Sequence, residues 1–236
     1  MDFTSFGLDP PKTGSREQLV YVQDCILVLE YVEQGSRQLE YLDFVCACPD
    51  TNKHDYHYVL NVWLKLFSYK QLCSRFDSIE LWTDGGPHHF KTRFCQWMWH
   101  WLSTNLFSQK RITHNFFTSY HGHSLADAHA ATDKRLLKNE LTASQQSRTV
   151  PTEQDAYWGP SSAADLAALL QREASRTEVI HLEAIQREEG IKPDVSPLRD
   201  IKSDHCFIYE HDTCAASERS GAPLTYPFSF TLLGAI

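Results

Sequence analysis

A short stretch from Asp77 to Lys91 constrains the fold more than any other part of the chain. Within it, Ile79 to Trp82 predicts a short strand, and this strand ends at Asp84 because Gly85-Gly86-Pro87 forces a turn. Open α/β sheets place their chemistry at the C-terminal ends of strands, where side chains converge in a crevice. Asp before Gly is also a frequent turn signal. Asp84 is therefore either a turn former or a ligand for a metal or substrate, and both interpretations remain open.

Hydrophobic periodicity predicts alternating strands and helices over residues 1–141. Runs of β-branched and aromatic residues predict strands, two of them joined as a hairpin, whereas apolar spacings of three to four predict helices. A segment rich in Ser, Thr, Gln and Pro then predicts a linker at 142–162, followed by a poorly ordered, mainly helical extension at 163–236. The expected strands are 19–32, 39–48, 79–84, 112–120 and 205–211, and the expected helices are 54–69, 88–107, 125–141 with Ser124 as N-cap, and 163–189.

Composition limits the class of protein. With 236 residues, of which 42% are hydrophobic, the chain can bury a core. Its seven cysteines are an odd number, lie mostly in apolar runs and follow no secretory signal, so we expect reduced thiols in an intracellular protein. No apolar run approaches the roughly 20 residues that a membrane helix needs. The net charge of −8 gives no support to a nucleic-acid partner, so DNA binding would require a local basic patch.

Three blocks of sequence carry a resemblance to a known family. They are Met1-Asp-Phe-Thr-Ser-Phe6, Trp82-Thr-Asp-Gly-Gly-Pro-His-His-Phe-Lys91 and Tyr120-His-Gly-His-Ser-Leu-Ala-Asp-Ala-His129. In this order and spacing the blocks resemble those of eukaryotic transposon-derived proteins of the DDE/DDD transposase type. The resemblance implies a ribonuclease-H-like α/β core at 1–141, with a mixed sheet flanked by helices. That fold begins with three antiparallel strands and has a central first strand, so we expect a truncated first strand ending near residue 2.

The resemblance also implies an activity and its residues. It gives Asp2, Asp84 and Asp127 as three metal-binding acids for DNA strand cleavage or transfer, with Asp24 as the alternative first acid. Mg²⁺, or Mn²⁺, is the implied cofactor, because hard cations prefer oxygen ligands and paired ions stabilise both the attacking and the leaving oxygen of a phosphate. The implied partner is DNA at transposon ends. We correspondingly expect a nuclear protein that has no membrane contact. We also expect it to self-associate into a homo-oligomer.

Four further side chains are candidates for contacts to the substrate phosphates: His88, Lys91, His121 and Lys134. Lys91 follows Asp84 by seven residues at the expected start of a helix, where it would neutralise a phosphate or simply face solvent. The twelve histidines do not form a recognisable zinc motif, since neither His-Glu-x-x-His nor Cys-x-x-Cys occurs. We therefore expect His88 and His121 to line the carboxylate cleft or to cap helices.

Two other functions compete with an active transposase. The missing front strand and the acidic net charge favour an inactive or domesticated transposon relic that works as a DNA- or protein-binding module. A metal-dependent exonuclease of the same fold would need a further acid on the last core helix. Asp133 is available for that role, although it lies on another helix face from Asp127.

Overall fold

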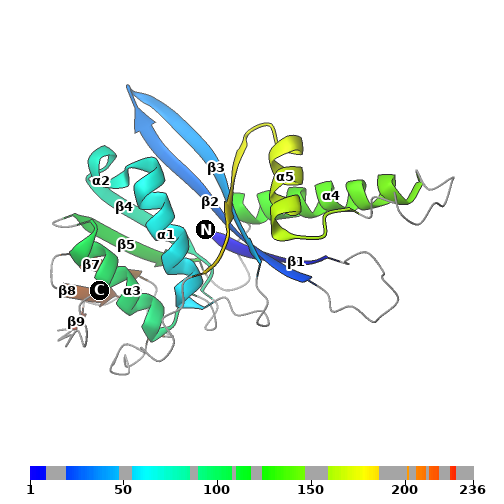
Figure 1. Cartoon of the computed structure of the whole chain (residues 1–236). Helices are drawn as coiled ribbons and strands as arrows, with labels where there is room; N and C mark the ends of the chain where they lie inside the picture. Colours follow the sequence, from blue (N-terminus) through cyan, green and yellow to red (C-terminus); the bar gives the residue numbers. More distant parts are fainter. Residues whose placement is uncertain are drawn as a thin grey trace. The chain divides into compact units, whose positions relative to one another are not determined.

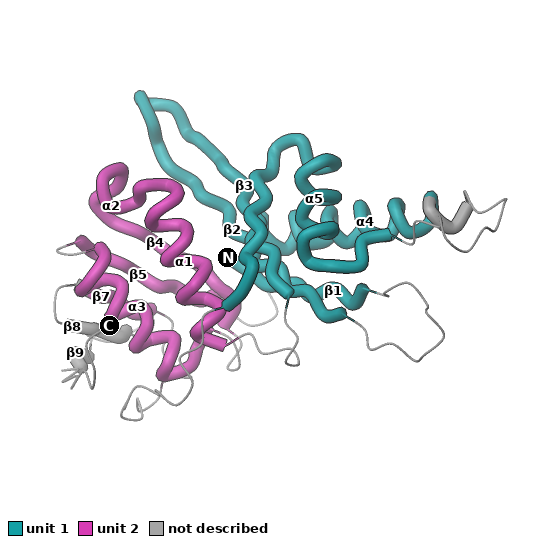
Figure 2. Tube along the Cα trace, in the orientation of Figure 1, with its two compact units in different colours: residues 1–53, 123–185 teal, residues 54–122, 186–236 magenta. Residues whose placement is uncertain are grey.

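The computed structural model describes residues 1–8, 20–47, 55–85, 90–107, 110–117, 124–146, 159–185, 201, 206–210, 213–217 and 224–226. The chain forms two compact units, one of residues 1–53 and 123–185 and the other of residues 54–122 and 186–236 (Figure 2). Each unit contains its own sheet, and the α/β class is confirmed. The division differs from the expected one, because residues 163–185 belong to the first unit rather than to a separate extension.

The sheet of the first unit has four strands in the order β1-β2-β3-β6 (Figure 1). β1, β2 and β3 form an antiparallel meander, and β6 pairs with β3 in parallel. The predicted hairpin is confirmed: Gln34 and Gly35, with φ of 50° and 78°, make the tight turn that joins β2 to β3. The strands are β1 Asp2–Leu8, β2 Val20–Glu33, β3 Ser36–Ala47 and β6 Thr177–Leu182.

The first strand begins at Asp2 instead of ending there. β1 pairs with β2 over seven residues, from Asp2 opposite Ile26 to Leu8 opposite Val20. The expected end of the first strand near residue 2 is therefore wrong, because Phe6 and Leu8 provide a buried apolar face that continues past residue 2. The central position is not observed either, since among the described residues β1 has β2 as its one strand neighbour.

The expected helix 163–189 is wrong beyond residue 173. α5 spans Ala163–Glu173, and the chain then enters β6, where Thr177, Val179 and Ile180 are β-branched and favour a strand. The Gln171 side chain joins the two elements, because its amide nitrogen donates to the carbonyl of Thr177 at 3.2 Å and its oxygen accepts from the backbone N–H of Val179 at 2.9 Å.

Two helices, α4 (Leu125–Gln146) and α5, cover one face of the first sheet (Figure 1). Phe6, Val22 and Val45 of the sheet pack with Leu137 of α4 and Leu166 of α5 in one hydrophobic cluster. Even-numbered residues of β1 and β2 therefore face these helices, together with odd-numbered residues of β3, because cross-strand partners share a face. This register decides which polar side chains lie beneath α4.

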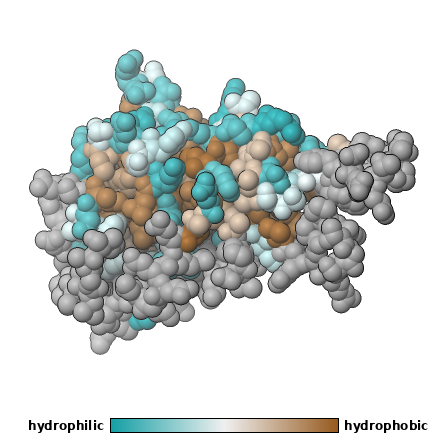
Figure 3. All heavy atoms as spheres, viewed as in Figure 1, coloured by the Kyte–Doolittle hydropathy of each residue, from teal (hydrophilic) through white to brown (hydrophobic). Residues whose placement is uncertain are grey.

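The far end of the β2–β3 hairpin faces solvent. Figure 3 shows this tip, at the upper edge of the view, as hydrophilic. Arg37 and Glu30 form an exposed ion pair there, with Nε and Oε1 2.7 Å apart. Exposed pairs contribute at most about 1 kcal/mol, so the hairpin depends on the buried half of its strands for stability.

The second unit has a five-stranded sheet in the order β4-β5-β7-β8-β9, with β4 and β5 parallel. The predicted elements between residues 54 and 120 are confirmed as to type, and so is the late strand, whereas β8 and β9 were not predicted. Trp63 and Trp99 pack edge to face in the core at 4.9 Å between ring centroids. The elements are α1 Tyr56–Lys70, α2 Leu72–Arg75, β4 Ser78–Thr83, α3 Arg93–Asn105, β5 Arg111–Phe116, β7 Cys206–Glu210, β8 Thr213–Ser217 and β9 Leu224–Tyr226.

None of the helices in the described part of the chain combines the length and the apolar character that crossing a bilayer requires.

Candidate functional site

Two of the three predicted acids meet in the first unit. Asp2 starts β1 and Asp127 lies in the first turn of α4, and their side chains share a hydrogen bond. Burial, and then this hydrogen bond, raises the pKa of Asp2 to about 6, while the backbone N–H of Phe3 acts in the opposite direction. Two carboxylates in contact repel each other, so this pair requires a shared proton or a cation between the two groups.

Asp127 also caps the helix that carries it. Its Oδ2 accepts from the backbone N–H of Ser124 at 2.7 Å and from the Ser124 hydroxyl at 2.9 Å. In return, the backbone N–H of Asp127 donates to Ser124 Oγ at 3.1 Å, which confirms Ser124 as the N-cap. The reciprocal bonds fix the orientation of the carboxyl group, and the hydrogen bond to Asp2 adds a contact from the sheet.

Asp84 belongs to the second unit, where it directly follows β4 and is exposed. The strand end is held to the next strand, because Phe117 donates its backbone N–H to Thr83 O at 3.0 Å. Gly85 lies against the same segment: a Cβ at this position would stand 2.9 Å from the Phe117 carbonyl oxygen. The glycine after Asp84 is thus required by a close approach of two backbone segments.

The candidate phosphate contacts lie in different environments. Lys91 is buried, precedes α3 instead of lying on it, and places its Nζ 5.1 Å from the centre of the Phe116 ring. Lys134 is exposed on α4. His88 and His121 lie outside the described residues.

Asp24, the alternative first acid, lies on β2 and is completely buried. It stands opposite Thr4 on β1 and Val45 on β3, so its side chain is on the face covered by α4. Burial raises its pKa well above the ordinary value, and the charges of Asp43 and Asp133 raise it further. Asp24 is therefore associated with a second group of acids rather than with Asp2 and Asp127.

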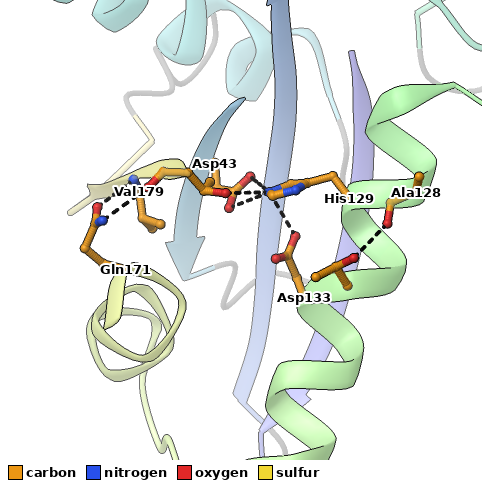
Figure 4. Close-up of polar contacts among 8 residues, drawn as sticks. Asp43, Ala128, His129, Asp133, Gln171 and Val179 are labelled. Atoms are coloured by element: carbon orange, nitrogen blue, oxygen red, sulfur yellow. Dashed lines mark hydrogen bonds and ion pairs between the residues drawn. The ribbon is translucent and has the colours of Figure 1, made fainter. Parts of the chain in front are cut away.

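That second group is an Asp-His-Asp cluster beneath α4 (Figure 4). His129 Nε2 lies 3.0 Å from Oδ1 and 3.2 Å from Oδ2 of Asp43 on β3. One turn further along α4, Asp133 places its Oδ2 3.5 Å from the same nitrogen. Thr177 of β6 adds a hydroxyl at 3.4 Å. Both carboxylate side chains are fully buried and the imidazole is 10% exposed.

Burial controls the protonation of this cluster. Desolvation raises the pKa of Asp43, although its contact with His129 acts in the opposite direction. Desolvation and the charge of Asp43 raise the pKa of Asp133 to about 7. For His129, desolvation favours the neutral ring, but the hydrogen bond to Asp43 and the charges of Asp43 and Asp133 together outweigh it, and the pKa is raised. The cluster therefore retains protons that free carboxylic acids would have lost at neutral pH.

Comparison with known proteins places the chain in a family. Residues 27–219 match the model of a family described as a domain of unknown function, DUF8701. The chain belongs to the DUF8701 family. No curated protein and no solved structure matches this DUF8701 chain.

Sequence reasoning did not find the Asp-His-Asp cluster of the DUF8701 chain. A signal was present, because Asp43 interrupts an apolar strand just as Asp24 does, and His129 and Asp133 are spaced i, i+4 on one helix face. The sequence did not show that Asp43 lies close to His129 and Asp133. Their proximity depends on the register of β2 with β3 and on the packing of α4 over the sheet.

Proposed function

We propose that this DUF8701 protein is a transposase-like enzyme that cleaves or transfers DNA strands with divalent metal ions. The observation that carries the proposal is the contact between Asp2 and Asp127, two carboxyl groups far apart in sequence. A hard cation such as Mg²⁺ or Mn²⁺ would replace their shared proton, because it prefers carboxylate oxygens. When bound, such ions supply Lewis-acid stabilisation of the attacking and leaving oxygens of a phosphodiester.

The order of elements supports a ribonuclease-H-like core as part of this proposal. An antiparallel meander comes first, a helix follows, and the parallel pair β4–β5 precedes the helix that bears Asp127. The hydrogen-bonded sheets are separate, however, and β1 is not paired with β4. The third acid of the proposal, Asp84, stands at the end of β4 in the second unit.

The roles of the residues follow from their positions. Asp2 and Asp127 would hold one side of the metal site, and the capping bonds from Ser124 keep Asp127 in place. Asp84, the third acid that the resemblance implies, is exposed at the end of β4 in the second unit. DNA in the nucleus would be the substrate, and Lys134 offers an exposed positive charge on α4 for its backbone.

A nicking assay with purified protein tests the proposal. Wild-type chain, supercoiled plasmid and Mg²⁺ or Mn²⁺ should yield nicked or joined products that disappear when a chelator is added. Asp2→Asn, Asp84→Asn and Asp127→Asn should each reduce the rate by at least about 100-fold, because each removes a charged metal ligand. Asp77→Asn, a change at an exposed acid of the second unit, is the matched control and should retain activity.

Equal rates in the wild type and in all three Asn variants would rule out the proposal. A wild-type chain that binds DNA without cleaving it under any metal condition would instead support the relic, a binding module without catalysis.

A further inference from the structure

We propose that Asp43, His129 and Asp133, with Asp24 beside them, form a second cation site, which takes a divalent first-row transition ion such as Zn²⁺. This site is separate from the Asp2–Asp127 pair and does not depend on DNA cleavage. Its ligands come from β3 and α4, with Asp24 beside them on β2, and all three elements belong to the first unit.

The ligand atoms are already at suitable distances. His129 Nε2 is 3.0 Å from Asp43 Oδ1 and 3.5 Å from Asp133 Oδ2, and one ligand atom from each of the three residues lies within 4.8 Å of the others. In a tetrahedral zinc site with bonds of about 2.0 Å, neighbouring ligands are about 3.3 Å apart. An ion could therefore bind without a large movement of the backbone.

Unsatisfied buried oxygens are the second observation. Among the described residues, neither carboxylate oxygen of Asp133 and neither of Asp24 has a hydrogen-bond partner, and both residues are 0% exposed. On the antiparallel pair β2–β3, Asp24 is opposite Val45 and Ile26 is opposite Asp43, and all four side chains share one face. Asp24 is therefore a diagonal neighbour of Asp43. Buried polar atoms without partners are costly, and a cation at the cluster would satisfy an oxygen of Asp133 and attract those of Asp24.

The charges of the cluster favour the same conclusion. The buried carboxyl groups of Asp43 and Asp133 face one imidazole and that of Asp24 lies near both, so their full ionisation would leave an uncompensated negative charge in a low-dielectric interior. Protons offset this charge in the absence of metal. A divalent ion would offset it more completely and would displace the protons as it binds.

The imidazole decides which class of ion fits. Mg²⁺ and Ca²⁺ select sites made of oxygen atoms, whereas a nitrogen ligand among carboxylates suits Zn²⁺ and its transition-metal neighbours. Because His129 Nε2 is the atom that faces both Asp43 and Asp133, that nitrogen would be the metal ligand. Such a site would tie α4 to the sheet and thereby position Asp127, two residues before His129.

Metal binding to the full-length chain tests the site. The measurements use Asp127→Asn as the starting protein, because this change disrupts the Asp2–Asp127 pair and leaves the second cluster intact. Titration with Zn²⁺ alone should show about one equivalent bound and a raised melting temperature, with a much weaker response to Mg²⁺. Adding Asp133→Asn or His129→Gln should weaken Zn²⁺ binding by at least about 100-fold, more than the loss of an outer-sphere partner costs.

Co²⁺ provides a measurement that does not depend on the variants folding. Bound Co²⁺ in the Asp127→Asn chain should give the visible absorption of a four-coordinate nitrogen and oxygen site without thiolate charge transfer, which excludes the cysteines as ligands. A Lys134→Gln change, on the exposed side of the same helix, should leave binding unaltered. Absence of Zn²⁺ and Co²⁺ binding, a thiolate spectrum, or unchanged affinity in folded Asp133→Asn and His129→Gln variants would overturn the proposal.

Discussion

His129 Nε2 on α4 lies 3.0 Å from Oδ1 and 3.2 Å from Oδ2 of Asp43 on β3, where the Asp43 side chain is fully buried. Such a pair links a helix to the sheet beneath it. Its strength depends on both partners, because removing one leaves the other buried without its counter-charge.

The first prediction concerns this ion pair. In metal-free buffer at pH 7, His129→Gln should destabilise the first unit by about 3 kcal/mol, since breaking a buried pair leaves Asp43 without its charged partner. Amide hydrogen exchange of peptides from β2 and β3 measures this unit directly. Tryptophan fluorescence is less suitable, because five of the six tryptophans lie between residues 54 and 122.

Glu30→Gln is the control for the ion-pair prediction. It removes the exposed pair with Arg37 on the same hairpin and should cost less than about 1 kcal/mol. Equal exchange rates in His129→Gln and Glu30→Gln would show that the buried pair does not stabilise the unit.

The second prediction concerns acid stability of the second unit. His114 is fully buried on β5, its Nε2 is 2.8 Å from Thr83 Oγ1, and burial lowers its pKa to about 3. The folded state therefore holds the neutral ring, whereas the unfolded chain takes up a proton below its ordinary pKa of 6.5. The stabilisation is complete above pH 6.5 and is lost as the pH falls towards 3, with a total on the order of 5 kcal/mol.

Unfolding followed by tryptophan fluorescence between pH 7 and pH 4 measures this loss, because Trp99 packs against His114 at 5.5 Å between ring centroids. His114→Gln should make the second unit less sensitive to acid, although it is less stable at pH 7. The control is His181→Gln, at an exposed position on β6, which should keep the pH dependence of the wild type. Parallel pH profiles for His114→Gln and the wild type would contradict the prediction.

The third prediction concerns the glycine after Asp84. Gly85→Ala should destabilise the second unit by about 1–3 kcal/mol, because the new Cβ would lie 2.9 Å from the backbone oxygen of Phe117 and neither backbone can move freely. Trp82 and Phe117 pack at 5.3 Å between ring centroids, so tryptophan fluorescence also reports a shift of this strand end.

Gly7→Ala serves as the comparison, since a Cβ at Gly7 on β1 meets nothing within 4 Å. It should be neutral or slightly stabilising, because alanine loses less conformational entropy than glycine on folding. A melting temperature for Gly85→Ala that matches the wild type would show that the contact with Phe117 can relax at no cost.

The amino-acid sequence determined the local elements of this protein. The antiparallel hairpin, the helices α1 and α4, the strand before Asp84 and the Ser124 cap all follow from short-range hydrophobic spacing and turn residues. The prediction failed at β6, where the apolar positions Val179 and Leu182 continue the helical spacing of α5. Whether such a segment forms a helix or a strand is decided by the pairing partner, here β3.

The tertiary structure alone decided which acids meet. Sequence motifs indicated Asp2, Asp84 and Asp127, and the structure brings Asp2 and Asp127 together. The sequence could not join Asp43 of β3 to His129 and Asp133 of α4, because contacts between distant segments depend on strand register and helix packing. Local sequence sets the period of each element, but a one-residue change of register would turn Asp43 to the other face of the sheet.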